Sequence, residues 1–222
     1  YRRHSAVLLT ARALDLEHRD AAAGKGLALE AAKLTPDLVP AATLAAHLCA
    51  ESGEWRRAAK LLEAAWRRNA HPDIADLYAH LRPGDSAHDR LQRVRLLARL
   101  RPGDCESALA IARAAIDAQE FEEARAALAP LVAQPTQRVA MLMAELEERE
   151  RGDSGRAREW MARAVRAQRD PAWTADGIVS DRWLPVSPVT GRIDAFAWKV
   201  PVAEIGPAGP ALDARAAAAP AA

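Results

Sequence analysis

The sequence has few of the residues on which most catalytic, metal-binding and disulfide-stabilised proteins depend. Two cysteines occur in 222 residues, Cys49 and Cys105, far apart and outside any Cys-x-x-Cys pair. Two such thiols predict neither a disulfide nor a zinc site, so we expect both to be small buried side chains. The chain also lacks a glycine-rich phosphate loop, a His-Glu-x-x-His or Gly-x-Ser-x-Gly motif, and paired carboxylates in apolar surroundings. These absences predict a protein that is not an enzyme and that holds no cofactor.

Aromatic side chains and excess charge are also scarce. Only 5% of the residues are aromatic although half are apolar, so the core must consist mainly of alanine and leucine, which suits closely packed helices. The net charge is +1, from 31 basic and 30 acidic residues, and this balance argues against nucleic acid as the main partner. The most apolar stretch, residues 38–50, contains Pro40 and His47 and is too short to span a bilayer. Any membrane anchor is therefore expected upstream of Tyr1.

Prolines recur at an interval typical of helical repeats. Five of them, separated by 36, 30, 33 and 36 residues, could each close one unit: Pro36, Pro72, Pro102, Pro135 and Pro171. These gaps lie close to the period of about 34 residues of tetratricopeptide (TPR) repeats. Inside the unit that ends at Pro72, Gly53 separates two apolar stripes of helical period, the second of which starts at Trp55. A small residue returns at Ala58, Ala124 and Ala157, where it would let the second helix of a unit approach the first.

The fold class expected from this pattern is all-α. We expect a TPR-like α-solenoid of about five helical hairpins over residues 1–171, with about ten helices and no sheet in that span. Because each hairpin leaves one apolar face uncovered, stacking of the hairpins supplies the core and creates a concave face that binds a protein partner. Six residues on the first helices of the hairpins are predicted to line this groove: Thr43, His47, Arg82, Leu109, Arg113 and Leu146. Their mixture of arginine and leucine favours a partner segment that is partly apolar and carries some acidic residues.

The helical period stops after Pro171. Residues 172–203 contain alternating apolar and polar positions, typical of short extended segments, and three tryptophans, Trp173, Trp183 and Trp198. We expect these tryptophans to fold the segment back onto the final hairpin as a non-helical cap, near Trp160, Met161 and Val165, because no sixth repeat covers that face. A ligand site in this segment is the alternative. Residues 204–222 are rich in Pro, Ala and Gly, a composition typical of disorder.

One turn of this segment has the layout of a metal-binding knuckle. In PVSPVTG, Ser187 and Thr190 stand where a Cys-Pro-x-Cys-Gly knuckle has its thiols. A rubredoxin-like ribbon uses two such knuckles, and neither has thiols here, so we expect no zinc or iron to bind. The sequence therefore predicts a cap that resembles a ribbon without its metal.

Several segments together resemble a known family. DPAWTADGIVSDRWLPVSPVTGRIDAFAWKVP, residues 170–201, with the preceding REWMARAVRAQ, resembles the C-terminal end of alphaproteobacterial HemY-type proteins. The upstream segments PDLVPAATLAAHL, HPDIADLYA and PTQRVAMLMAELE resemble repeats of the same family. The resemblance extends over nearly the whole chain, and its specific part is the C-terminal segment.

The resemblance implies a TPR protein of the bacterial inner membrane that is associated with haem biosynthesis. Such proteins are anchored by two N-terminal transmembrane helices, absent from this fragment, and the resemblance places the repeats on the cytoplasmic side as a scaffold for haem-pathway enzymes. An unrelated flavin-dependent protoporphyrinogen oxidase shares the family name, but this chain has no dinucleotide fingerprint and that activity is not carried over. The alternative function is a carrier that binds haem or porphyrin directly, for which His47 is the best candidate axial ligand.

Overall fold

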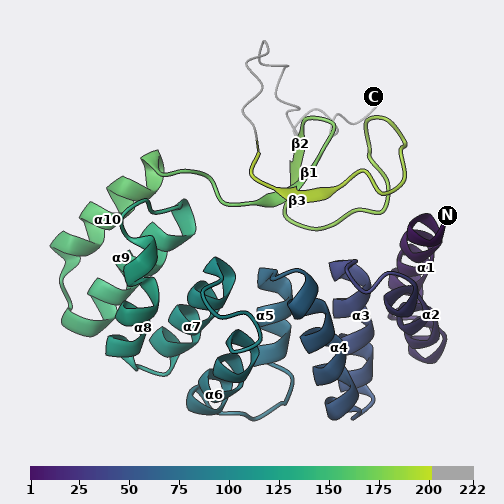
Figure 1. Ribbon diagram of the computed structural model, residues 1–222, viewed down its shortest axis with the longest axis horizontal. Coiled ribbons are helices and arrows are strands. Elements are labelled where there is room, and N and C mark those ends of the chain that lie inside the picture. The colour runs from purple at the N-terminus through teal and green to yellow at the C-terminus, as the bar shows by residue number, and fades with distance from the viewer. Residues whose placement is uncertain (202–222) are drawn as a thin grey trace, which may run out of the picture.

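A computed structural model describes residues 1–201, and these residues form ten α-helices followed by a small antiparallel sheet. The helices follow an arc from α1 to α10, and the strands lie across its open side (Figure 1). The helices are α1 (Arg2–Leu16), α2 (Ala21–Leu34), α3 (Val39–Glu51), α4 (Trp55–Arg68), α5 (Pro72–Ala79), α6 (Ala87–Ala98), α7 (Cys105–Asp117), α8 (Phe121–Leu128), α9 (Gln137–Arg151) and α10 (Ser154–Arg166). A 3-10 turn (Ala129–Leu131) extends α8, and the strands are β1 (Ala172–Ala175), β2 (Ile178–Ser180) and β3 (Ala197–Lys199). The expectation of a mostly helical protein with about ten helices before Pro171 is confirmed.

Consecutive helices pack as pairs, α1 with α2 and so on to α9 with α10, and each pair also contacts the next. The five evenly spaced prolines all lie between pairs or after the last one. Pro72 is the first residue of α5, where its missing N–H costs no helical hydrogen bond. The others stand in the segments that follow α2, α6, α8 and α10.

The turn inside a pair is repeated along the chain. Gly53, Gln119 and Gly152 follow the ends of α3, α7 and α9 with φ of 77°, 62° and 63°. In all three turns the next residue donates its backbone N–H back into the helix, Glu54 to Cys49 and Glu120 to Ala115 at 2.8 Å and Asp153 to Glu147 at 3.3 Å. Gln119 thus adopts the left-handed conformation that glycine adopts in the other two turns, a conformation that costs a residue with a Cβ some stability.

The sequence LRPGD occurs twice, at residues 81–85 and 100–104, and the helix that follows is capped differently in the two places. In the second, Asp104 caps α7 by accepting the backbone N–H of Glu106 at 2.9 Å, as its position after Gly103 suggests. In the first, Ser86 caps α6 through a capping box with Asp89, and Asp85 instead pairs with Arg93.

Two clusters of buried side chains form the core. One spans α1 to α5 and includes Leu48, Leu62 and Trp66, and the other spans α6 to α9 and includes Leu109, Ile116 and Leu146. Both cysteines are free thiols. Cys49 is buried in the first cluster as expected, but the same expectation for Cys105 is wrong, because Cys105 begins α7 and its side chain lies outside the stripe that packs.

The C-terminal segment forms a three-stranded sheet with strand order β2-β1-β3. Both pairings are antiparallel, and Trp173 of β1 stands opposite Ser180 of β2 and Trp198 of β3. The short extended segments expected in this part of the chain are therefore present. The last two residues of the expected cap, and the segment 204–222 expected to be disordered, lie outside the residues that the structure describes.

The sheet does not cover the final hairpin, and that expectation is wrong. Trp173, Trp183 and Phe196 are 6%, 8% and 2% exposed and belong to the core cluster of α1 to α5. On α10, in contrast, Met161 and Val165 remain 49% and 84% exposed. The segment therefore covers the inner side of the N-terminal half of the arc.

The path of residues 167–171 explains this placement. The N–H of Gln137 donates to the carbonyl of Gln168 at 3.0 Å, and the N–H of Arg138 donates to the carboxylate of Asp170 at 2.7 Å. These bonds hold the returning chain against the first turn of α9 and direct it away from α10. At the far end of the segment, Asp194 forms an ion pair with Arg3 of α1, so the segment bridges the two ends of the arc.

The knuckle-like turn is closed by hydrogen bonds. Ser187 is 1% exposed, and its Oγ accepts the backbone N–H groups of Val189 and Thr190, both at 3.3 Å. Thr190 Oγ1 donates to the carboxylate of Asp176 at 2.7 Å, and hydrogen bonds from Ser187 and Thr190 hold the pKa of Asp176 below its usual value. The hydroxyl groups thus join the two turns of the segment directly.

His71 is the residue on which the sheet packs. It is fully buried, with its ring centroid 5.2 Å from that of Trp173 and 4.0 Å from that of Trp198. Its Nδ1 accepts the N–H of Asp73 at 3.1 Å as the cap of α5, whereas its Nε2 is buried without a hydrogen-bond partner among residues 1–201. Burial, with a contribution from Arg138, lowers the pKa of His71 to about 4.

This burial predicts that docking of the sheet weakens in acid. As the pH falls from the ordinary histidine pKa of 6.5 to about 4, His71 gains a proton only when it is exposed, which favours the undocked or unfolded state. At about 1.4 kcal/mol per pKa unit, the loss of stability approaches roughly 3 kcal/mol. The measurement is urea unfolding, followed by tryptophan fluorescence, at pH 7.5 and pH 4.5.

His71→Asn keeps a capping side chain and removes the titration, so its unfolding free energy should change less between the two pH values than that of the wild type. His88→Asn, which alters an exposed histidine, should behave as the wild type does. The pKa of Asp73 is raised by burial and acts in the opposite direction, and Asp73 is unchanged in both variants. An equal acid response in His71→Asn and the wild type would disprove the assignment.

Candidate functional site

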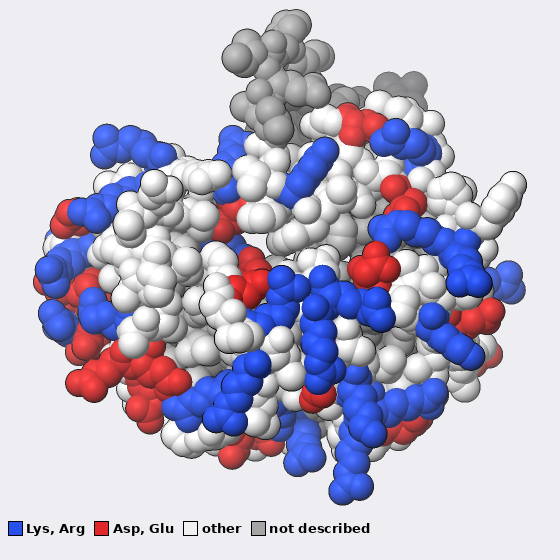
Figure 2. Space-filling model, in the orientation of Figure 1, with Lys and Arg blue, Asp and Glu red and all other residues white. Residues whose placement is uncertain are grey.

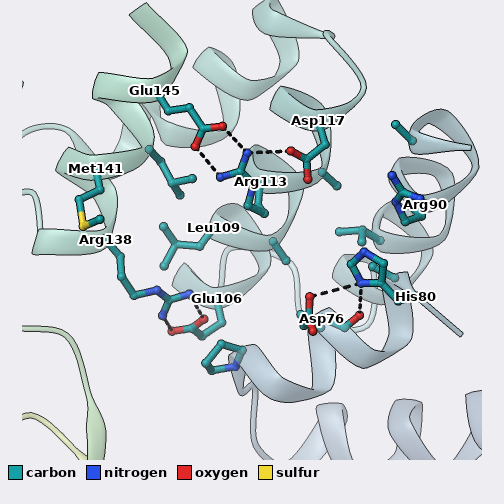
Figure 3. Close-up of a pocket in the computed structure, with 18 of the residues that line it drawn as sticks. Asp76, His80, Arg90, Glu106, Leu109, Arg113, Asp117, Arg138, Met141 and Glu145 are labelled. Atoms are coloured by element: carbon teal, nitrogen blue, oxygen red, sulfur yellow. Dashed lines mark hydrogen bonds and ion pairs between the residues drawn. The ribbon is translucent and has the colours of Figure 1, made fainter. Parts of the chain in front are cut away.

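The inner side of the C-terminal half of the arc contains an open cavity of about 630 Å³. Five helices, α5, α6, α7, α9 and α10, contribute to its wall (Figure 3). On α7 the lining residues are spaced by three, one, three, one and three, the spacing of a single helical stripe: Glu106, Leu109, Ala110, Arg113, Ala114 and Asp117. The cavity is therefore formed by equivalent faces of neighbouring pairs.

The floor of the cavity is apolar and made largely of small side chains. Alanines from α5, α7, α9 and α10 line it, together with Leu109, Met141 and Met161. Met141 and Met161 are each 49% exposed, so flexible thioether side chains border the opening. Small residues leave room for a bound chain to approach the helix backbones, and methionines adapt to different shapes.

Ion pairs between α7 and α9 cross the cavity wall at a fixed sequence interval. Arg138 pairs with Glu106 at 2.7 Å, Arg113 with Glu145 at 2.6 Å, and Arg149 with Asp117 at 3.4 Å. The two partners are 32 residues apart in every case. Equivalent positions of successive helix pairs thus carry opposite charges. The ion pairs between them fix the register of α9 against α7.

The charges on this wall neutralise one another. Both Oε atoms of Glu145 accept hydrogen bonds from Arg113, which also donates to Asp117 at 2.7 Å. Hydrogen bonds from Arg113, joined by Arg149, hold the pKa of Glu145 below its usual value, and those to Glu145 and Asp117 raise the pKa of the Arg113 guanidinium. The wall therefore offers little unpaired charge to a ligand.

The opposite wall carries His80, Asp76 and Arg90. His80 Nδ1 lies 2.9 Å from the backbone oxygen of Asp76 and 3.3 Å from its carboxylate, so the other ring nitrogen is left free. Arg90 donates to the backbone oxygen of Asp85 at 2.9 Å. Figure 3 shows His80 and Arg90 facing the cavity across from α9.

Two of the six residues predicted for the groove line this cavity, Leu109 and Arg113. Leu146 is fully buried in the core, one position away from Glu145, which does line the cavity, so the prediction for it is wrong. Arg82 also differs from expectation, because α5 ends at Ala79 and Arg82 lies in the following loop beside a different hollow.

Thr43 and His47 lie on α3, and no residue of α3 lines the cavity. Thr43 Oγ1 donates to the backbone oxygen of Val39 at 3.0 Å. His47 Nε2 lies 3.6 Å from Glu17 and 3.4 Å from Glu51, both carboxylates. These surroundings place His47 at the surface of the N-terminal half, beside two carboxylates.

Sequence reasoning missed most of the polar lining, namely Glu106, Arg138, Asp117 and Glu145. One signal could have found them. Opposite charges recur 32 residues apart at three positions of a helical stripe, and a search for such compensated pairs between units would have placed α7 beside α9.

No family model matches the chain. One relative is a probable magnetosome protein, Mms48, from Magnetospirillum gryphiswaldense, which is 29% identical over 200 residues. The match covers 88% of this chain and 44% of the relative, so the chain spans less than half the length of that protein. Within residues 1–201, no helix is long and apolar enough to cross a membrane, and no three His, Cys, Asp or Glu side chains are grouped to hold a metal ion.

The ion pairs predict a measurable coupling between α7 and α9. The Glu106 side chain is 14% exposed and that of Arg138 is 33% exposed. A double-mutant cycle of Glu106→Gln and Arg138→Gln, measured by urea unfolding, should therefore give a coupling of about 1–2 kcal/mol. The matched control is the exposed pair Arg163 and Glu159 within α10, which should give about 0.5 kcal/mol or less. Equal couplings in the two cycles would show that the pair across the cavity does not hold the register.

Proposed function

We propose that this chain is a non-catalytic, TPR-like helical repeat protein that binds a segment of a partner protein in the cavity between α5 and α10. The observation that supports this proposal is an open apolar cavity of about 630 Å³ built from equivalent stripes of successive pairs. Concave apolar clefts with a few oriented polar groups are the usual places for binding. The adaptable methionines and small floor residues favour a peptide chain over a single rigid ligand.

The arrangement of charges changes the expected partner. The expectation of an acidic partner segment assumed that the arginines of the groove are unpaired. Arg113 and Arg138 are instead already paired with carboxylates. Displacing these pairs would cost more than a new pair of the same kind returns. The segment proposed for the cavity is therefore mainly apolar, and its polar groups meet the Asp76 and Arg90 side.

The wider setting is also a proposal. The C-terminal segment supports a HemY-type scaffold at the cytoplasmic side of the inner membrane, associated with haem biosynthesis by resemblance alone. The relative is named a probable magnetosome protein. In this setting, the chain is proposed to assemble other proteins and to perform no reaction of its own.

Filling the cavity tests the proposal. Ala110→Trp with Ala157→Trp places two large side chains on α7 and α10 where the cavity is lined, so capture of partner proteins from cells that produce the chain should be lost. Ala11→Trp is the matched control, because Ala11 on α1 is also partly exposed but lines neither the cavity nor the hollow between α4 and α6. Mass spectrometry compares the captured proteins, and thermal melting verifies that each variant folds. Identical sets of captured proteins would contradict a role for the cavity.

A carrier of haem or porphyrin is the second candidate, and the position of His80 favours it. His80 lines the cavity with Nδ1 held by Asp76, and Met141 and Leu109 line the same space. A histidine oriented through one ring nitrogen can offer the other to an iron atom. This assignment replaces His47, which lies outside the cavity.

Absorbance titration with haemin distinguishes the two functions. A carrier should show a saturable shift of the Soret band that His80→Ala abolishes and His47→Ala leaves intact. Absence of a saturable shift, or a shift that His80→Ala does not alter, would eliminate this second function and leave the scaffold.

A further inference from the structure

Positive charge is concentrated in the middle of the chain. Residues 55–99, which span α4 to α6, contain ten Lys and Arg and five Asp and Glu, a net charge of +5. Because the whole chain has a net charge of +1, the remaining residues carry −4. On the face shown in Figure 2, Lys and Arg side chains gather over the middle of the array. The nearly neutral net charge of the whole chain therefore does not reveal that its middle region is basic.

The five acidic residues of this span leave many of its cations free. Asp85 pairs with Arg93, Asp89 is held in the capping box of α6, and Glu63 accepts the hydroxyl of Tyr78 at 2.8 Å. Asp73 and Asp76 lie on α5 and contact histidines. Six basic side chains of this span form no ion pair or hydrogen bond within residues 1–201: Arg56, Lys60, Arg67, Arg68, Arg82 and Arg99.

Two of these arginines border a second hollow of about 370 Å³ between α4 and α6. Arg56 and Arg82 are both exposed at its edge. Trp55 and Leu96 line it, and Leu96 is 54% exposed. Asp85 and Asp89 line the hollow too, but Asp85 is paired with Arg93 and Asp89 is held in the capping box of α6. The hollow therefore combines a recess for one apolar side chain with two guanidinium groups that have no partner among residues 1–201.

We propose that this hollow, with the surrounding basic face, binds an acidic segment of a partner protein in which carboxylates flank an apolar or aromatic residue. Guanidinium groups bind carboxylates through paired hydrogen bonds, and complementary charge speeds and orients association. A recess receives a side chain, whereas a membrane-binding face presents protruding apolar residues to the bilayer. The hollow thus fits a peptide better than an anionic lipid surface.

This surface is separate from the cavity of the proposed function, since the two share no lining residue. The cavity receives an apolar segment and the basic hollow receives an acidic one. Together they would let one chain hold two different partners at once.

The test uses a defined probe, the capped peptide Glu-Glu-Phe-Glu-Glu, titrated into the isotopically labelled chain and followed by amide chemical shifts. Shifts should be concentrated at residues 55–59 and 92–96. Arg56→Glu with Arg82→Glu should weaken binding roughly tenfold, and raising the ionic strength should weaken it as well. The control is Arg12→Glu with Arg166→Glu, which reverses two exposed arginines elsewhere that form no ion pair within residues 1–201. It should bind nearly as the wild type does.

Three further results separate the possibilities. Gln-Gln-Phe-Gln-Gln should bind much more weakly, and Ala110→Trp should leave binding of the acidic probe unchanged, whether or not the cavity itself proves functional. The proposal is overturned if the acidic probe does not bind, or if the Arg56 and Arg82 reversal has no effect. It is also overturned if phosphatidylglycerol vesicles or duplex DNA bind through these arginines and the peptide does not.

Discussion

The burial of His71 between Trp173 and Trp198 is the contact on which the arrangement of the rest depends. It brings the C-terminal sheet onto the inner side of α1 to α5 and thereby covers half of the concave surface with the chain itself. The other half, over α5 to α10, stays open as the larger cavity. A polar ring in this position also makes the closure conditional, because a buried imidazole is stable only while it is neutral.

Charge is distributed so that the two hollows differ. On the wall of the larger cavity, arginines of α7 and α9 pair with carboxylates 32 residues away in the sequence. These ion pairs hold α9 in register against α7. At the hollow between α4 and α6, Arg56 and Arg82 have no such partners among residues 1–201. The same residue type is therefore paired within the structure at one hollow and unpaired within residues 1–201 at the other, and its neighbours decide which.

Much of the fold could be predicted from sequence because its signals are local. Prolines stop helices, left-handed glycines such as Gly53 and Gly152 turn the chain, and a stripe with helical period shows which face packs. Individual site residues were harder to predict. Leu146 and Glu145 are neighbours on α9, yet one is core and the other lines the cavity, and a shift of one residue rotates a side chain by about 100° around a helix.

By itself, the sequence determined the helical class, the number of helices, the boundaries between pairs and the extended character of residues 172–201. These properties depend on interactions between residues a few positions apart, which spacing and residue type reveal. Only the tertiary structure decided that Trp173 and Trp198 pack on His71 and that Val165 stays exposed. It also decided that Arg113 is paired with Glu145, while Arg82 has no ion-pair partner within residues 1–201. These outcomes depend on contacts between residues that are distant in the chain, where several apolar faces and several carboxylates compete for the same side chain.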